Sequence, residues 1–399
     1  ETLNSMVPLW QRAKKDVTQE EYDEFYTKKF ADYEKPLSTI TVNAEGTLSF
    51  RAMLFIPGRA PYDYYTREYE KGLQLYSSGV MIMDKCAELL PDYFSFVKGV
   101  VDTPDVSLNI SREMLQHTRQ LKVIANNIEK RIKNDLLRMQ RDEPEKYEQF
   151  WNAFMTQIKY AIVGDYGVNK DKLRDLLMFV SSNEEKLTTL AAYKDRMAEG
   201  QKYIYYASGE SVQRVAKLPQ AERILAQGYE ILYLTDEVDE FVIEVLEKHD
   251  DIEFKSINDA DALPETEEEK QAAEKTAEEN EELLEFVTST LEGKIKEARI
   301  SKILRSHAVC MTTDGALTIE MEKYMHRRGN VIPGMETERV LELNPESGAF
   351  NALKNAFEAG NEELAGKYAE LLYCQALLIA ELPLEDPAAY SDLVCSLMQ

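Results

Sequence analysis

The sequence predicts a mixed α/β (α+β) fold that is divided into several units. Its 399 residues are enough for two or three domains of about 100–200 residues each. Hydrophobic residues make up 44% of the chain and aromatic residues 10%, so the chain can build hydrophobic cores. Segments with helical spacing of apolar residues alternate with strand-like runs, which indicates both kinds of secondary structure throughout.

Residues 1–130 are predicted to form a large α/β unit. The stretch DVTQEEYDEFYTKKF has a threonine cap and apolar positions at helical spacing. STITVNAEGTLSFRAMLFIP contains two strand-like runs joined by a turn, which predicts a hairpin, and LQLYSSGVMIMD predicts a second strand pair. A long amphipathic helix is expected in SREMLQHTRQLKVIANNIEKRIKNDLLRM.

Residues 131–255 are predicted to form a smaller α/β unit. QKYIYYAS is a β-rich run, and RILAQGYEILYLTDEVDEFVIEVLEKH predicts a helix, a buried strand and a second helix. This alternation favours a parallel sheet with crossover helices. Residues 256–282 are dense in Glu and lack large apolar residues, which indicates a solvated linker or surface helix; an acidic docking tail is the alternative.

Residues 283–399 are predicted to form a third unit with strands, helices and an apolar end. ALTIEMEKYMHRRG predicts a helix that carries Met321, Tyr324 and Met325 on one side. The helix predicted in NEELAGKYAELLYCQALLIAEL has apolar residues at helical spacing, namely Leu364, Tyr368, Leu371, Leu372 and Leu378. With one more short helix after it, little chain is left to cover this face. We therefore expect two copies to pair through a C2 helical bundle; an ordinary intramolecular core is the alternative.

The charge and the cysteines exclude several classes of protein. With 72 acidic and 47 basic residues the formal charge is -25, which disfavours binding to nucleic acid phosphates. No run reaches the ~18 apolar residues of a membrane-spanning helix, so we expect no membrane partner. Four scattered cysteines without a C-x-x-C pair fit a cytoplasmic protein and suggest no zinc or other metal site.

The chain has no recognisable active site of its own. It lacks the phosphate-binding loop, the dinucleotide fingerprint, the H-E-x-x-H zinc motif and the G-x-S-x-G elbow. Two segments nevertheless carry arginines without an obvious acidic partner. In NISREMLQ, Ser111 is a good helix cap, and Arg112 and Gln116 share a face. A solvated first turn is one interpretation of this segment, and an arginine that senses a phosphate is the other.

The second segment is FIPGRAPYDYY, which places Arg59 and Tyr62 on a proline-rich loop after a strand. Arginine can contact a γ-phosphate through two hydrogen bonds and can stabilise the charge that builds up in phosphoryl transfer. Such a role needs no nucleotide-binding motif in this chain if the nucleotide arrives on another domain.

In LFIPGRAPYD and VKGVVDTPDVSLNISREMLQ the chain closely resembles the ninety-kilodalton heat-shock chaperone family, of the bacterial HtpG type. The similarity continues in the family's order through PLWQR, QEEYDEFY, IKYAIVGD, QKYIYYASGES, GYEILYLTDEVDEF and LELNP. It implies that residues 1–255 are the family's middle domain, made of two α/β subdomains joined by helices. Residues 283–399 would be a small α+β C-terminal domain with a helical dimerisation bundle. The N-terminal ATP-binding domain would be absent, in keeping with a first stretch, ETLNSMVPLW, that lacks an initiator methionine.

The resemblance also implies roles for the two arginine segments. Arg112 matches the family arginine that reaches the γ-phosphate, and Gln116 matches the glutamine of the same loop. Arg59 and Tyr62 match residues that support the contact with the ATP domain. ATP and Mg²⁺ would bind only in the full-length protein, so this fragment alone is expected neither to bind nor to hydrolyse ATP.

Non-native client proteins and a second copy of the chain are the partners that the resemblance implies. The positions that match client-contacting residues are Trp10, Phe241, Met321, Tyr324 and Met325. Methionine and aromatic surfaces suit promiscuous binding because they repack easily. The final residues SLMQ lack the acidic tail of eukaryotic relatives, which favours a bacterial, cytoplasmic protein. Two other hypotheses stay open: a purely structural dimerisation scaffold, and an independent enzyme with an unrecognised site.

Overall fold

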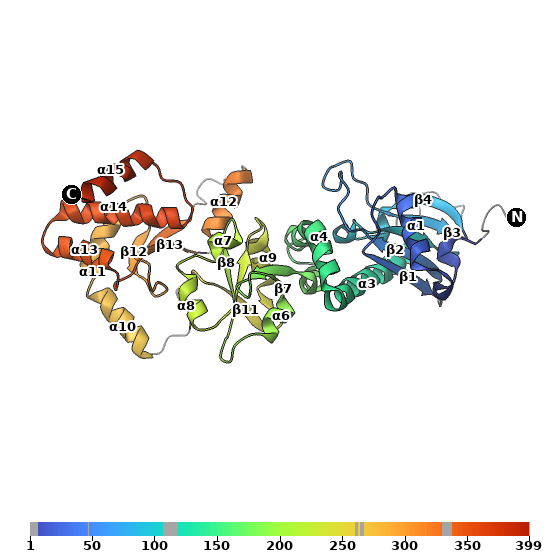
Figure 1. The fold of residues 1–399 in the computed structure, drawn as a ribbon, viewed down its shortest axis with the longest axis horizontal. Coiled ribbons are helices and arrows are strands. Elements are labelled where there is room, and N and C mark those ends of the chain that lie inside the picture. Colours follow the sequence, from blue (N-terminus) through green and yellow to red (C-terminus); the bar gives the residue numbers. More distant parts are fainter. Residues whose placement is uncertain are drawn as a thin grey trace. The chain divides into compact units, whose positions relative to one another are not determined.

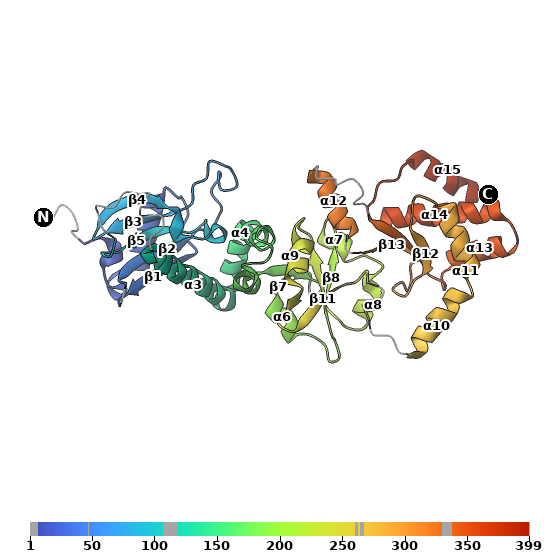
Figure 2. The ribbon, with the colours of Figure 1, turned by 180° about the vertical axis from the view of Figure 1, so that it is seen from behind.

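The computed structural model describes residues 7–46, 48–106, 119–259, 262–263, 267–315, 317–328 and 337–398 (Figures 1 and 2). The chain divides into two compact units, Glu1–Met178 and Phe179–Gln399. Both units combine helices with a β-sheet, which confirms the predicted α/β (α+β) fold class. In the described part of the chain, no helix has the length and apolarity that crossing a membrane requires.

The first unit is built around a five-stranded sheet with the order β1-β2-β5-β3-β4. Its strands are β1 (Ser38–Ala44), β2 (Phe50–Ile56), β3 (Leu73–Ser77), β4 (Val80–Cys86) and β5 (Lys98–Asp102). Its α-helices are α1 (Gln19–Phe30), α3 (Arg119–Asp142), α4 (Pro144–Gly164) and α5 (Lys170–Leu173). Short 3₁₀ turns lie at Leu9–Gln11, Lys14–Asp16, Ala87–Leu89, Asp92–Phe94 and Arg174–Leu176.

The local predictions for this unit are confirmed. β1 and β2 form the predicted antiparallel hairpin, and β3 and β4 form the second antiparallel pair. Helix α1 begins at a complete capping box: the Thr18 hydroxyl accepts from Glu21 N at 3.3 Å, and the Glu21 carboxylate accepts from Thr18 N at 2.9 Å. These elements depend on residues that are close in the sequence, which is why the sequence alone predicts them.

Aromatic side chains form the core of this unit. Residues from α1, β2 and β3 build one cluster, in which Tyr26, Phe55 and Tyr76 are buried. A second group joins the segment before β5 to α4, because Phe96 stacks on Phe154 with 4.4 Å between ring centroids. The sheet is thereby fixed to the helices, and the loops that leave its strands have a rigid base.

Helix α3 is amphipathic, as predicted, with buried residues three or four positions apart at Leu121, Ile124, Ile128, Ile132, Leu136 and Met139. The domain limit predicted at residue 130 falls inside this continuous helix, and the two compact units meet instead at Met178 and Phe179. The start of the predicted helix, at Ser111, lies outside the described residues.

The second unit contains a six-stranded sheet with the order β10-β11-β8-β9-β6-β7. Its strands are β6 (Met178–Ser181), β7 (Leu187–Thr189), β8 (Ile204–Ser208), β9 (Ile231–Leu234), β10 (Lys248–His249) and β11 (Ile252–Ser256). Its α-helices are α6 (Leu190–Asp195), α7 (Val212–Val215), α8 (Ala221–Ala226) and α9 (Asp239–Leu246). β8 pairs in parallel with β9 and β11, as predicted, but β6 and β10 pair in antiparallel fashion, so the sheet is mixed.

The same unit also contains a three-stranded sheet with the order β12-β14-β13. Its strands are β12 (Glu297–Ile300), β13 (Val309–Asp314) and β14 (Glu338–Leu343). Its α-helices are α10 (Glu267–Glu278), α11 (Glu281–Thr290), α12 (Ile319–Arg328), α13 (Gly348–Glu358), α14 (Glu362–Ile379) and α15 (Pro387–Leu397). The acidic stretch predicted as a linker or surface helix contains α10.

Helix α14 is covered more fully than the sequence suggested. It packs against α11, α13, α15 and β13 within its own unit (Figure 1). Its buried residues are Ala365, Ala369, Leu372, Tyr373, Ala376 and Leu377. The expectation that little chain is left to cover α14 is therefore wrong, because α11 and α13 supply the missing partners.

The capping box of α1 gives a direct test of local stability. We expect Thr18→Ala to lower the free energy of unfolding of the first unit by about 1 kcal/mol, since α1 would lose its N-cap acceptor. Both tryptophans of the chain, Trp10 and Trp151, lie in this unit, so tryptophan fluorescence during urea unfolding reports on it selectively. Thr27→Ala is the matched control, because the exposed Thr27 hydroxyl only donates to Glu24 O within the helix. Equal losses in both variants would contradict the capping role.

Candidate functional site

Arg59 lies on the loop after β2 and is held by two carboxylates. Its guanidinium lies 3.5 Å from Asp32 Oδ1 and 3.3 Å from Glu34 Oε1, and half of the side chain is exposed. The expectation that Arg59 lacks an acidic partner is therefore wrong. Its partners lie more than twenty residues earlier, in the turn after α1, and the fold of the sheet brings the two loops together.

Within this ion pair, the Asp32 carboxylate is held in place by hydrogen bonds. Tyr26 Oη donates to Asp32 Oδ2 at 2.6 Å, and Glu34 N donates to Asp32 Oδ1 at 3.2 Å. Burial raises the pKa of the Asp32 carboxyl, but these hydrogen bonds and the charges of Lys98 and Arg59 outweigh burial, so the pKa lies below its ordinary value. Asp32 is thus a stable anion that orients Arg59 while leaving half of the guanidinium side chain in solvent.

Tyr62 stands three residues after Arg59 and is fully exposed, at 104% of the reference area. Its neighbour Tyr64 is buried, and the Tyr64 hydroxyl shares a 2.8 Å hydrogen bond with Ser95 Oγ. The loop is therefore anchored at Tyr64 and presents Tyr62 to solvent. The other two residues predicted for this site, Arg112 and Gln116, lie outside the described residues.

Trp10, predicted as a client-contacting residue, is partly buried in the first unit. Its indole packs 4.8 Å from the Tyr76 ring and 6.1 Å from the Phe25 ring, and its Nε1 donates to Asp102 Oδ2 at 3.1 Å. Asp102 also accepts from Gln11 Nε2 at 2.7 Å. These contacts place Trp10 against the sheet, so only part of its ring faces solvent.

Helix α12 brings together three of the other predicted client-contacting residues with Phe241 on α9. The rings of Phe241 and Tyr324 lie 5.2 Å apart at 59°, and both side chains are partly buried. Met325 is partly buried as well, but Met321 is only 6% exposed. Met321, predicted to contact clients, is therefore turned away from solvent, because this side of the helix faces the interior of the unit.

Polar contacts hold the two ends of α12 to α9 and to the turn just before α9. The Thr318 hydroxyl, just before the helix, donates to Glu240 Oε2, and Arg327 Nη1 lies 3.4 Å from Glu237 Oε1. Sequence reasoning missed Glu240 and Glu237, and no local signal distinguishes them among the 72 acidic residues. Their role becomes visible only once α9 and α12 are side by side.

The Glu240 carboxyl has a raised pKa in this region. Burial raises its pKa above the ordinary value, and the nearby charges of Glu320 and Asp239 act in the same direction. The hydrogen bond that Thr318 donates opposes the shift but does not cancel it. An ionised Glu240 therefore costs the folded state free energy, which a neutral side chain at this position would not.

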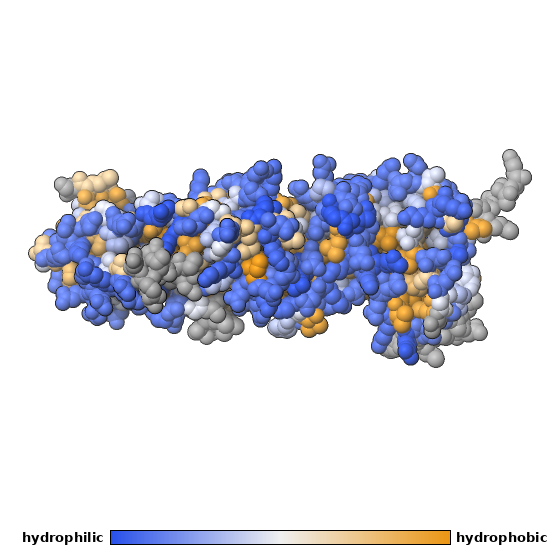
Figure 3. Space-filling view, turned by 90° about the horizontal axis from the view of Figure 1, so that it is seen from below, coloured by the Kyte–Doolittle hydropathy of each residue, from blue (hydrophilic) through white to orange (hydrophobic). Residues whose placement is uncertain are grey.

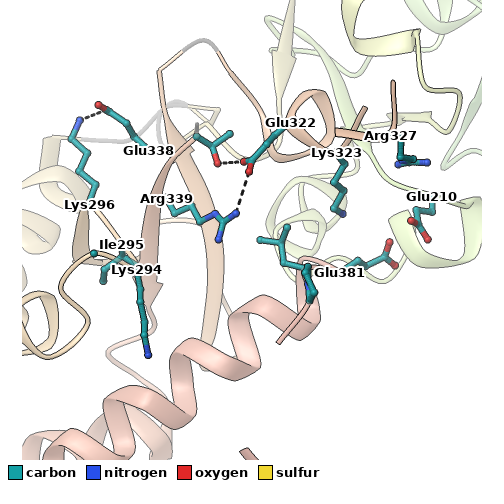
Figure 4. A pocket seen from close by; sticks show the side chains of 14 residues that line it. Glu210, Lys294, Ile295, Lys296, Glu322, Lys323, Arg327, Glu338, Arg339 and Glu381 are labelled. Atoms are coloured by element: carbon teal, nitrogen blue, oxygen red, sulfur yellow. Dashed lines mark hydrogen bonds and ion pairs between the residues drawn. The ribbon is translucent and has the colours of Figure 1, made fainter. Parts of the chain in front are cut away.

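A cavity of about 700 Å³ opens beside α12 (Figure 4). Its lining includes Glu322, Lys323 and Arg327 of α12 together with Lys294, Ile295, Lys296, Glu338, Arg339, Glu381, Leu382 and Pro383. Several of these charges already neutralise each other across the lining, as Arg339 Nη2 lies 3.2 Å from Glu322 and Lys296 Nζ lies 2.5 Å from Glu338. The described residues contain no cluster of His, Cys, Asp or Glu that could hold a metal ion.

The residues predicted for a dimer interface occupy different environments. Leu372 is 3% exposed in the core of its own unit, and Leu364 and Tyr368 pack against that core, so these three serve the intramolecular fold. Leu371 is partly buried and Leu378 is 48% exposed. The physical reason is that α13 and α11 already cover this side of α14.

Helix α15 carries an apolar face that its own unit leaves partly exposed. None of its residues is buried, although Tyr390, Leu393, Val394 and Leu397 follow helical spacing. Elsewhere, the face of the molecule in Figure 3 is mainly hydrophilic with separate hydrophobic patches. Sequence reasoning recognised α15 as a helix but did not name its residues as an interface. The helical spacing of these four apolar residues was the signal in the sequence that could have identified them.

Comparison with known proteins identifies close relatives. The family model for "Hsp90 protein" matches residues 1–399. The chain is 52% identical over 402 residues to the chaperone protein HtpG of Clostridium acetobutylicum and 52% identical over 398 residues to that of Shouchella clausii. It is 48% identical over 401 residues to that of Bacillus subtilis. Each alignment covers 100% of this chain but 63% of the relative, so the chain spans less than two thirds of these proteins' length.

Because the pKa of Glu240 is raised, we predict that Glu240→Gln increases the thermal stability of the second unit in a pH-dependent way. A carboxyl whose pKa is raised by folding stabilises the fold below its unfolded pKa of about 4.3, and this contribution is lost as the pH rises through the folded pKa. We therefore expect the variant to raise the Tm of the second unit at pH 7 and to lose this advantage near pH 4. Calorimetry measures the Tm of the second unit. Because both tryptophans lie in the first unit, tryptophan fluorescence identifies the transition of the first unit and does not report the second. Glu244→Gln, an exposed change on α9, is the control and is expected to leave Tm unchanged; a matching gain there would contradict our explanation.

Proposed function

Because the chain belongs to the Hsp90 protein family, we propose that it is the core of a cytoplasmic molecular chaperone that pairs two copies, binds non-native proteins and completes an ATPase. The observation that carries this proposal is the family match over all 399 residues. The relatives are longer than this chain, so we place the ATP-binding domain in the part that they have in addition. ATP and Mg²⁺ belong to that domain, and residues 1–399 alone would hydrolyse nothing.

Arg112 is proposed as the residue that this chain supplies to the nucleotide. An arginine that approaches the γ-phosphate neutralises the charge that spreads over its oxygens in the transition state. Gln116 would act beside it, while Arg59 and Tyr62 would contact the ATP-binding domain. The exposed Tyr62 ring and the half-exposed Arg59 guanidinium, oriented by Asp32, support a docking role for this loop.

The proposed division of the chain follows the family. Residues 1–255 would be the middle domain, 256–282 an acidic linker or surface helix, and 283–399 the C-terminal dimerisation domain. Two copies would pair mainly through α15, joined by the exposed Leu378 and the partly buried Leu371 of α14. A C2 bundle would cover the apolar side chains of α15 that its own unit leaves open.

Non-native proteins are the proposed substrates of the Phe241–Tyr324–Met325 surface. Its aromatic and methionine side chains can adapt to many apolar sequences, which suits a chaperone without a single partner. Trp10 could contribute only the part of its ring that faces solvent. A dimerisation scaffold without any catalytic role is the alternative, and the ion pairs that occupy Arg59 are the observation that favours it.

The catalytic proposal predicts that Arg112→Ala in the full-length protein lowers the ATP turnover number by roughly 100-fold or more, because a charged transition state loses its arginine. Nucleotide affinity should change far less, since the phosphates are held by the other domain. Arg119→Ala, at an exposed position at the start of α3, is the control and should keep normal turnover. Unchanged turnover in the Arg112 variant would favour the structural scaffold instead.

The dimer proposal predicts that Leu393→Asp produces monomers at micromolar concentration. In a C2 interface each substitution occurs twice, so two charges would enter one apolar contact. Sedimentation velocity measures the association state, and circular dichroism checks that helix content is kept. Asp392→Ala changes an exposed neighbour on the same helix and should leave the dimer intact. A wild-type chain that sediments as a monomer would remove the proposed interface.

A further inference from the structure

Helix α12 and the residue before it contact α9 and the turn before α9 at three levels. At its start the Thr318 hydroxyl donates to Glu240, in its middle the Tyr324 ring packs on Phe241, and at its end Arg327 pairs with Glu237. The polar contacts thus frame the aromatic contact on both sides. This arrangement fixes both the position of α12 along α9 and its rotation about its own axis.

The opposite side of α12 is held by the rest of the unit. Lys323 Nζ donates to Ala380 O at 2.9 Å, just after α14, and Glu322 Oε1 lies 3.2 Å from Arg339 Nη2 on β14. Between these contacts Met321 is almost completely buried. Helix α12 is therefore held on two sides. In this position it partly buries Phe241 and Tyr324, whose side chains the proposed function requires to be accessible.

The contacts that hold α12 in place are individually weak enough to break. Arg327 and Glu237 keep 48% and 41% of their side chains exposed, and exposed ion pairs of this type are individually weak. The Phe241–Tyr324 contact is a single ring pair, and solvent can replace each hydrogen bond when the helix lifts. A closed state held by several weak contacts is compatible with a minor open population that a ligand can select.

We propose that α12 is a regulatory clasp on the client-binding surface. Closed, it buries Met321 and the sides of the Phe241 and Tyr324 rings that face each other; open, it offers these surfaces to the apolar segments of a non-native protein. This inference rests on the proposed function and adds a control to it. Client binding and clasp closure compete for the same side chains, so the apparent affinity for clients falls in proportion to the closed fraction.

A reversible cross-link tests the clasp in the complete 399-residue chain. Glu237→Cys and Arg327→Cys replace the exposed pair at the end of α12, in a background in which the accessible Cys374 and Cys395 are replaced by Ser. A bismaleimide with an internal disulfide then ties α12 to α9, and a reducing agent releases it. The probe is fluorescently labelled, reduced and carboxymethylated α-lactalbumin, a permanently unfolded protein, whose binding is followed by anisotropy.

The matched control links Lys194→Cys to Asp250→Cys in the same background. This pair is also exposed, with 41% and 43% of the side chains accessible, but it lies away from α12. We expect the α12 link to weaken probe binding by about five-fold or more and reduction to restore it, because the link removes the open population. The control link should change nothing.

A charge change gives an independent measurement without a linker. Glu237→Arg places two positive charges together at the end of α12 and should tighten probe binding by about two-fold, because repulsion favours the open clasp. Adding Arg327→Glu restores an opposite pair and should return the affinity to its original value.

The outcomes separate the clasp from the proposed function. If linked and released chains bind the unfolded probe equally, the clasp is refuted while client binding stands. If no form of the chain binds the probe, including the wild type, the proposed client-binding function fails, and the clasp fails with it.

Discussion

The docking of α12 on α9 determines which apolar side chains of the second unit reach solvent. One ring contact and two polar contacts fix the helix, and they turn Met321 inward while Tyr324 and Met325 stay partly accessible. The proposed client surface therefore depends on an interaction between two helices that are separated by about eighty residues of sequence. If this contact were absent, the same stripe would be a permanently exposed apolar patch, which favours aggregation.

In the first unit, an acidic residue orients an arginine whose side chain stays half exposed. Hydrogen bonds from Tyr26 and Glu34 hold the Asp32 carboxylate in place, and this carboxylate lies 3.5 Å from the Arg59 guanidinium. The Asp32 side chain is only 10% exposed but half of the Arg59 side chain remains in solvent, so another anion can reach the guanidinium.

The last two helices contribute differently to the core of their unit. Helix α14 fills this core with Leu372 and its neighbours, whereas no residue of α15 is buried. Three of the residues predicted for an interface on α14 therefore pack in or against the core, and the apolar side chains of α15 stay partly exposed.

The local elements and the family can be predicted from the amino-acid sequence alone. The Thr18 cap, the β1–β2 hairpin and the helices with apolar faces follow from contacts within a few residues, which a single sequence displays directly. Stretches such as SREMLQ and RAPYD carried the resemblance that the family match confirms.

The tertiary structure is needed to say which side of each amphipathic helix faces inward and which acid meets which base. Arg59 could pair with any of 72 acidic residues, and the choice of Asp32 depends on two loops meeting beside one sheet. Likewise, burial in the folded unit raises the pKa of Glu240, and nothing in the local sequence indicates that burial. Periodicity defines an apolar face, but the identity of its partner depends on contacts distant in sequence, and those are set by how whole elements pack.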